Sequence, residues 1–192
     1  MDSLSNKNLV KVEDSSGITL QEGHEEEGED EGESTYDPHV WLSPKNAKVE
    51  MKNIRDGLIK ADPDHKSYYN ENYNTYEAEI DELDQKYKEA LTGLTNKDII
   101  VAHEAFGYLC SAYGLNQVPI EGLSADSEPS PAKMEEVIQF AKDNKVKVIF
   151  FEELVNPKVA KTIAKEAGVS TDVLNPLEGL SEEDIKAGGD YF

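Results

Sequence analysis

The sequence predicts an α/β protein whose C-terminal half is a parallel sheet and whose middle is one long helix. Two observations carry this prediction. Short apolar or β-branched runs alternate with amphipathic segments between residues 98 and 177, in the order expected of consecutive βα units. Upstream, apolar and tyrosine side chains recur at steps of four and three across residues 67–94, which predicts a continuous helix.

The segment before the first predicted helix contains few folding signals. We expect a short strand at residues 9–12, followed by a turn. Residues 21–35 carry eight carboxylates between Gln21 and Glu33 and no apolar side chain, so burial cannot offset the entropy of ordering them. We therefore expect an acidic loop that is disordered or mobile. Both chain ends resemble interrupted elements, which suggests truncation.

Two helices are predicted in succession. Ser43-Pro44 is a helix start, with serine as the cap and proline at the first helical position, and the sequence "ADPDH" ends that helix. The second helix, residues 67–94, allows two interpretations: a coiled-coil seam, or a rod packed lengthwise on globular lobes. Half of the seam is tyrosine, whose hydroxyl needs a polar edge, and this favours the rod. The seam residues are Tyr69, Tyr73, Tyr76, Ile80, Leu83, Tyr87, Ala90 and Leu94.

The C-terminal half reads as strand, helix, strand, helix, strand, helix, strand, which predicts a parallel sheet covered on both faces. The strands are "IIVAH", "QVPIEG", "VKVIFF" and "TDVLNPL". In such sheets, ligands bind beyond the carboxyl ends of the strands. His103 ends the first strand, Glu152 and Glu153 end the third, and Glu178 follows the fourth. We interpret Glu152 and Glu153 as residues that start the following helix.

Composition narrows the class of partner. Forty acidic and nineteen basic residues give a net charge of −21, which disfavours nucleic acid and anionic lipid as partners and is compatible with a cation. No apolar stretch has the length of a membrane span. The single cysteine, Cys110, lies in an apolar helical run and is expected to be a buried structural thiol.

Two of the four histidines are candidate metal ligands. His24 and His65 stand in polar surroundings and are expected to be solvated, whereas His39 and His103 stand among apolar and aromatic residues at junctions of elements. Imidazoles together with strand-end carboxylates suit zinc. The separation of His39 and His103 in the sequence excludes a zinc finger, whose ligands fall close together.

Four motifs in order carry a family resemblance: "DPHVWLSP", "AHEAFGY", "EPSPAKMEEVIQFAKDNKVKVIFFEELVNPKVAKTIAKEAGV" and "VLNPLEGL". With them the chain resembles the metal-specific solute-binding proteins of bacterial ABC importers, and within these the zinc-binding, adhesin-like branch. The resemblance implies two α/β lobes joined by one rigid helix, with the metal in the cleft between them. It divides the chain into the remainder of an N-terminal lobe (1–64, with the acidic loop at 21–35), a linking helix (65–95) and a C-terminal metal-binding lobe (96–192).

The resemblance also implies the ligands. They would be His39 of the DPHxW motif, His103 of "AHEAFGY" and Glu178 of "LNPLEGL". Manganese-specific members carry glutamate where this chain has His103, so histidine there favours Zn²⁺. The family's first ligand, another histidine, would lie upstream of Met1. We therefore expect weak zinc binding, or a coordination shell completed by water, buffer or a neighbouring chain.

The implied function is an extracytoplasmic receptor, periplasmic or anchored at the cell surface as a lipoprotein, that captures Zn²⁺ and delivers it to the membrane permease of an ABC transporter. We expect a monomer when the protein is full length, and no catalytic activity. The acidic loop would either steer cations to the cleft or act only as a solubilising tether. The alternatives are a manganese receptor of the same family, an acidic adhesion or interaction module, and a zinc enzyme. The enzyme is disfavoured because the sequence lacks an HExxH motif and a nucleophile elbow.

Overall fold

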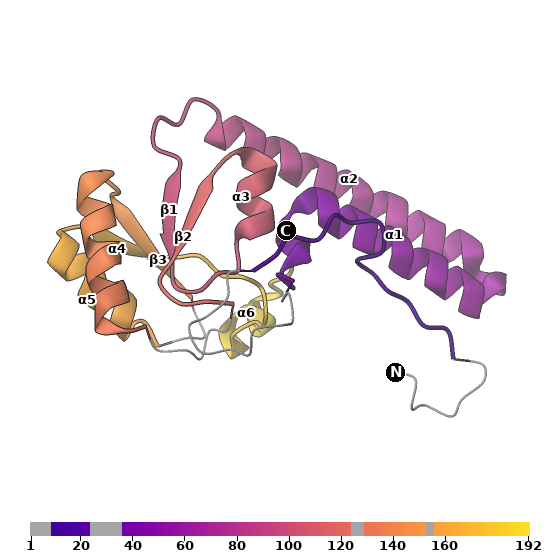
Figure 1. The fold of residues 1–192 in the computed structure, drawn as a ribbon. Helices are drawn as coiled ribbons and strands as arrows, with labels where there is room; N and C mark the ends of the chain where they lie inside the picture. The colour runs from indigo at the N-terminus through magenta and orange to yellow at the C-terminus, as the bar shows by residue number, and fades with distance from the viewer. Residues whose placement is uncertain (1–8, 24–35, 124–128, 153–155) are drawn as a thin grey trace.

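The computed structural model describes residues 9–23, 36–123, 129–152 and 156–192. His24, Glu153 and most of the predicted acidic loop lie outside these ranges. Figure 1 shows a pair of long helices beside a second part that contains the sheet. The elements, in chain order, are a 3₁₀ turn at Val40–Leu42, α1 (Pro44–Ala61), a 3₁₀ turn at Pro63–His65, α2 (Lys66–Leu91), β1 (Asp98–Val101), α3 (Gly107–Tyr113), β2 (Asn116–Pro119), α4 (Pro131–Asp143), β3 (Val148–Phe151), α5 (Lys158–Ala167), β4 (Ser170–Val173) and α6 (Glu182–Ala187).

Helices α1 and α2 pack along each other, and the chain reverses between them at the predicted break. Pro44 opens α1 after Ser43, whose backbone is extended at φ −89° and ψ 118°. Tyr73 and Ile80 of α2 are buried, and the Arg55 guanidinium of α1 stacks over the Tyr73 ring, 4.3 Å from its centroid. The predicted helices are confirmed. The α2 seam is covered in part: Tyr73 and Ile80 are buried, whereas Tyr76 is 48% exposed, and α2 packs lengthwise against α1.

The predicted strand at residues 9–12 is wrong. These residues have an irregular backbone, although the turn expected after them is present at residues 14–17. No strand among the described residues lies alongside to pair with them. Val12 instead packs on Gly57 of α1, where a Cβ would lie 2.2 Å from Val12 Cγ2. The β pairing formed by the described part of this region is a single antiparallel bridge between Glu22 and Tyr36.

The sheet has four parallel strands in the order β2-β1-β3-β4, which confirms the predicted α/β class. Ile100 of β1 and Ile149 of β3 are Cα partners at its centre, and both are fully buried. One face carries an apolar cluster with Val137 of α4 and Ile163 of α5. This face of the sheet is therefore a buried part of the core.

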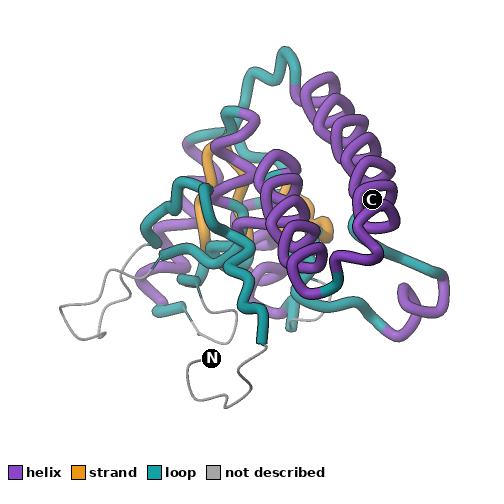
Figure 2. Tube along the Cα trace, turned by 90° about the vertical axis from the view of Figure 1, so that its right-hand side faces the viewer, coloured by secondary structure: helices purple, strands orange, loops and turns teal. Residues whose placement is uncertain are grey.

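The opposite face of the sheet is covered by α3 and the segment before α1. Leu42, Phe106 and Leu109 form this second cluster together with Cys110. Cys110 is 3% exposed, which confirms the predicted buried thiol, and this burial raises its pKa to about 12. Figure 2 shows the sheet-containing half from the side, with the long helices running past it. Among the helices described, none combines the length and the apolar character that a bilayer crossing requires.

Candidate metal centre

Three side chains from distant parts of the chain meet beyond the carboxyl ends of the strands. His39 comes from the segment before α1, His103 follows β1, and Glu178 follows β4. His39 Nε2 lies 2.9 Å from Glu178 Oε1 and 3.4 Å from His103 Nε2, and His103 Nε2 lies 3.6 Å from the same carboxylate oxygen. One ligand atom from each residue can be chosen so that all three lie within 4.8 Å of one another. The structure thus brings together all three of the residues predicted as ligands.

The cluster is closed on the imidazole side and open on the carboxylate side. His39 and His103 are 2% and 0% exposed, whereas the Glu178 side chain is 42% exposed. The two rings meet edge to face, with centroids 5.2 Å apart. A cation could therefore reach the Nε2 atoms from the side of Glu178.

A local turn fixes His39. Asp37 Oδ1 accepts hydrogen bonds from the His39 backbone N–H at 2.9 Å and from the Nδ1 side of its ring at 2.7 Å. The backbone of Asp37 is itself held on both sides: its N–H donates to the Gln21 carbonyl, and its carbonyl accepts from the Tyr108 hydroxyl of α3. The bond to Asp37 therefore holds the buried His39 ring in one orientation.

Glu152 holds the His103 ring, so its predicted role at the start of a helix is wrong. Glu152 is not a helix-start residue, because α5 begins only at Lys158 and its first N–H donates to Asn156. Glu152 is 3% exposed, and its Oε1 is hydrogen-bonded to Nδ1 of His103. A strand-end carboxylate was visible in the sequence, but its partner depends on β1 and β3 being neighbours, which the sequence does not reveal.

Glu178 is positioned by the loop after β4. The residue before it, Leu177, has a positive φ of 57°, and its N–H donates to Asn175 Oδ1 at 2.8 Å. The indole N–H of Trp41 donates to the Pro176 carbonyl at 2.9 Å. Trp41 also packs against the His39 ring, with centroids 5.4 Å apart. A non-glycine residue in the left-handed region costs free energy, so this loop is held in shape by its contacts.

The charges around His39 favour its protonated form. Burial lowers the pKa of His39, but the neighbouring carboxylates of Asp37 and Glu178 outweigh this effect and raise the pKa above its ordinary value of 6.5. The same carboxylates would favour a bound cation between the rings. His65, in contrast, is 68% exposed and bonded to Asp62, which confirms that it is a solvated side chain.

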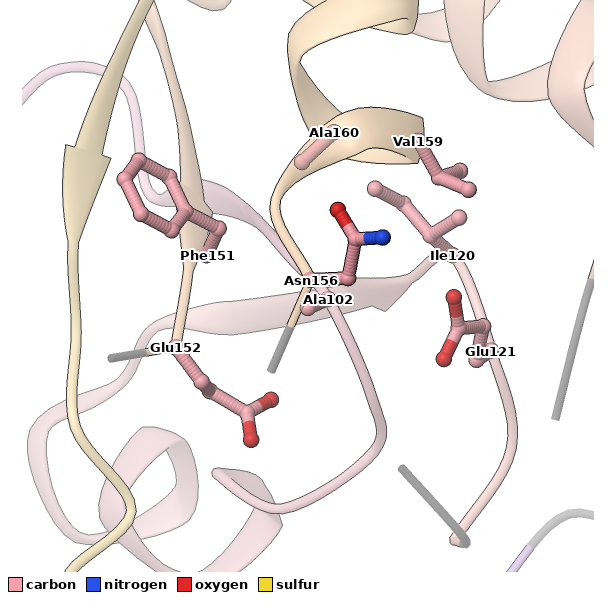
Figure 3. Close-up of a pocket in the computed structure, with 8 residues that line it drawn as sticks. All are labelled: Ala102, Ile120, Glu121, Phe151, Glu152, Asn156, Val159 and Ala160. Atoms are coloured by element: carbon pink, nitrogen blue, oxygen red, sulfur yellow. The ribbon is translucent and has the colours of Figure 1, made fainter. Parts of the chain in front are cut away.

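A small cavity adjoins Glu152 on the sheet side of the cluster (Figure 3). Its volume is about 10 Å³, comparable to one water molecule and too small for an organic ligand. Its lining residues are Ala102, Ile120, Glu121, Phe151, Glu152, Asn156, Val159 and Ala160. None of the three candidate ligands lines this cavity, so it is separate from the cluster that they form.

Comparison with known proteins places this geometry in context. The family model "ZnuA: Zinc-uptake complex component A periplasmic" matches residues 1–192. The high-affinity zinc uptake system protein ZnuA of Bacillus subtilis (strain 168) is 47% identical over 196 residues, which cover 99% of this chain and 61% of that protein. The zinc-binding lipoprotein AdcA of Streptococcus pneumoniae (strain ATCC BAA-255 / R6) is 43% identical over 198 residues, covering 100% of this chain and 40% of AdcA. The chain thus spans only part of the length of these relatives.

Solved structures agree with the sequence comparisons. The metal-dependent lipoprotein YcdH from Bacillus subtilis superposes with a TM-score of 0.76 at 47% identity, over 94% of this chain and 64% of YcdH. The Zn(II)-bound ZnuA-like domain of Streptococcus pneumoniae AdcA gives a TM-score of 0.74 at 42% identity, over 93% of this chain and 63% of that domain.

Proposed function

Because the chain belongs to the family of periplasmic zinc-uptake components, we propose that it binds Zn²⁺ through His39, His103 and Glu178 as the capturing receptor of a zinc importer. The observation that carries the proposal is the convergence of the three possible ligand atoms within 4.8 Å. The zinc-binding names of the relatives support the choice of metal.

The donor set favours zinc over manganese. Zinc takes imidazole nitrogen and carboxylate oxygen readily in a shell of about four ligands, whereas manganese prefers sites richer in oxygen. Two imidazoles and one carboxylate supply three donors and leave at least one position for water or a further residue. A manganese receptor of the same family remains the alternative, and direct competition between the two metals distinguishes them.

The proposed receptor role belongs to the full-length protein. We propose that the protein acts outside the cytoplasm, tethered as a lipoprotein, and passes its ion to the membrane permease of an ABC transporter. The family description "periplasmic" and the relative named a lipoprotein support this location. The ion is cargo in this proposal, so the site has to bind and release it and needs no catalytic turnover.

We also propose a division of the chain into three parts. Residues 1–64 would belong to one lobe, residues 65–95 would form the linking helix, and residues 96–192 would form the metal-binding lobe. The single helix α2 between the α1 region and the first strand of the sheet supports this division. His39 comes from the first part and the other two ligands from the third, so a bound ion would tie the two parts together.

Zinc titration by calorimetry tests the proposal. The chain should bind one Zn²⁺, and His39→Ala and His103→Ala should each weaken binding by at least about tenfold, a loss of about 1.4 kcal/mol or more. His65→Ala is the matched control, because His65 is exposed and bonded only locally to Asp62. Manganese added as competitor should displace zinc poorly. Equal zinc affinity in the wild type and in both site variants would refute the proposed ligands.

A further inference from the structure

We propose that Asp37 and Glu152 are positioning residues of the metal site. Each holds one ligand imidazole by its Nδ1 side, so that the Nε2 atoms of both rings are presented to the cation. The inference rests on the proposed metal binding and deepens it, because it identifies the groups that make two histidines into a preformed pair of donors.

The tautomer follows from the hydrogen bonds. A neutral imidazole carries one ring proton, and a carboxylate can only accept it, so a carboxylate on Nδ1 keeps the proton there and leaves the Nε2 lone pair free for a metal. Asp37 Oδ1 lies 2.7 Å from Nδ1 of His39, and Glu152 Oε1 is bonded to Nδ1 of His103. Both Nε2 atoms face Glu178, at 2.9 and 3.6 Å from its Oε1.

The register of the sheet explains how Glu152 reaches His103. Ile100 of β1 and Ile149 of β3 are Cα partners in neighbouring parallel strands. His103 and Glu152 each lie three positions beyond these isoleucines, so they leave the sheet at the same level and side by side. The pairing of β1 with β3 sets the level at which both segments start, and each residue lies just past the end of its strand.

Burying the carboxylates of Asp37 and Glu152 costs desolvation free energy. Asp37 is 4% exposed and Glu152 is 3% exposed. Removing a carboxylate from water is unfavourable unless hydrogen bonds compensate, and apolar residues could close the end of a sheet at lower cost. Each of the two carboxylates is hydrogen-bonded to a ring nitrogen of one proposed ligand, and Asp37 accepts the His39 backbone N–H as well.

Glu152 allows a cleaner test than Asp37. Asp37 Oδ1 also accepts the His39 backbone N–H, so its loss would disturb the local turn as well as the ring. Glu152 acts across 49 residues of sequence through its side chain. Figure 3 shows its side chain extending from the end of β3, beside the small cavity that Glu121 also lines. Glu121→Gln is therefore the matched control for loss of a carboxylate charge at this strand edge.

The experiment compares the wild-type chain with Glu152→Leu, Glu152→Gln and Glu121→Gln by zinc calorimetry and by nitrogen NMR of the histidine rings. Glu152→Leu should weaken zinc binding about 10- to 100-fold, the usual effect of removing such a partner. Glu152→Gln should keep affinity within about tenfold, because its amide oxygen still accepts Nδ1–H. Glu121→Gln should bind as the wild type does. In NMR, His103 should carry its proton on Nδ1 in the wild type and Glu152→Gln, and partly on Nε2 in Glu152→Leu.

Two results would overturn the inference. One is wild-type zinc affinity and an unchanged His103 tautomer in Glu152→Leu. If thermal melting shows that this variant does not fold, Glu152→Gln decides: a ring proton on Nε2 combined with wild-type affinity would show that binding does not depend on the tautomer. Failure of the wild type itself to bind zinc would refute the proposed function instead, and the tautomer measured without metal would still test the positioning by Glu152.

Discussion

The buried carboxylate of Asp84 joins the long helix α2 to α3 of the sheet-containing half. Loss of this bond should lower the free energy of unfolding by a measurable amount. Asp84 is 9% exposed; its Oδ1 accepts a hydrogen bond from the Tyr113 hydroxyl of α3 at 3.0 Å, and its Oδ2 accepts from Lys88. The Tyr113 ring stacks on Tyr87 of α2, with centroids 5.0 Å apart. Tyr113→Phe keeps the stacking and removes only the bond to Asp84.

The magnitude follows from the charge on the acceptor. A hydrogen bond to an ionised group contributes about 1.5–3 kcal/mol, and Asp84 keeps Lys88 as a partner, so Tyr113→Phe should cost about 1.5 kcal/mol. Burial raises the pKa of Asp84, but the bonds from Lys88 and Tyr113 outweigh it and hold the pKa below 3.8. A pKa that is lower in the folded state stabilises the fold above the unfolded-state value and loses this effect as pH falls through the folded-state pKa. The cost of Tyr113→Phe should therefore shrink in acid.

Urea unfolding of the wild type, Tyr113→Phe, Asp84→Asn and the double variant forms the assay. The double-mutant cycle should give a coupling energy of about 1–2 kcal/mol at neutral pH. A coupling below about 0.5 kcal/mol, or a Tyr113→Phe deficit that stays constant as the pH is lowered, would refute the claim that this bond joins α2 to α3.

Three further predictions concern the hydrophobic core, the buried carboxyl of Glu50 and the proposed metal ligand Glu178. Ile163→Ala removes a fully buried side chain of α5 and should lower the free energy of unfolding by about 2–5 kcal/mol in urea titration. Lys161→Ala, on the exposed side, loses only a contact over the Phe151 ring and should lower it by less than about 1 kcal/mol. Burial, together with Asp14, raises the pKa of Glu50 from 4.5 to about 7, so its carboxyl costs the fold stability progressively as pH rises from 4.5 to 7. Glu50→Gln should gain stability over the wild type across this interval, reach its full advantage of at most about 3 kcal/mol above pH 7, and show no advantage below pH 4.5 in pH-dependent melts. Glu178→Gln should weaken zinc binding at least about tenfold in calorimetry, with little change in thermal stability because the side chain is 42% exposed.

The sequence predicted the parallel sheet and the edge at which the site lies, because alternating apolar runs and helix-start residues are local signals. It placed the end of α2 three residues too late: Thr92 has an extended backbone and Gly93 a φ of 82°, so the helix ends at Leu91 although the apolar pattern continues. The predicted strand at residues 9–12 was wrong because strand formation depends on a partner that local sequence does not specify.

The sequence predicted the candidate metal ligands better than it predicted the carboxylates that hold the ligand rings. His39, His103 and Glu178 were predicted by the motifs of a resembling family, and the structure brings them together. Glu152 was misassigned because its role follows from the strand order, which sets β1 beside β3. Asp37 stands in the DPHxW motif, but its bond to the His39 ring depends on side-chain geometry.

The measurement that tests the account most directly is anomalous diffraction at the zinc edge from crystals of the chain grown with Zn²⁺. The account predicts one zinc ion about 2.0–2.1 Å from Nε2 of both His39 and His103 and about 2.0–2.2 Å from a carboxylate oxygen of Glu178. An ion bound elsewhere on the acidic surface, with these three side chains left without metal, would contradict it.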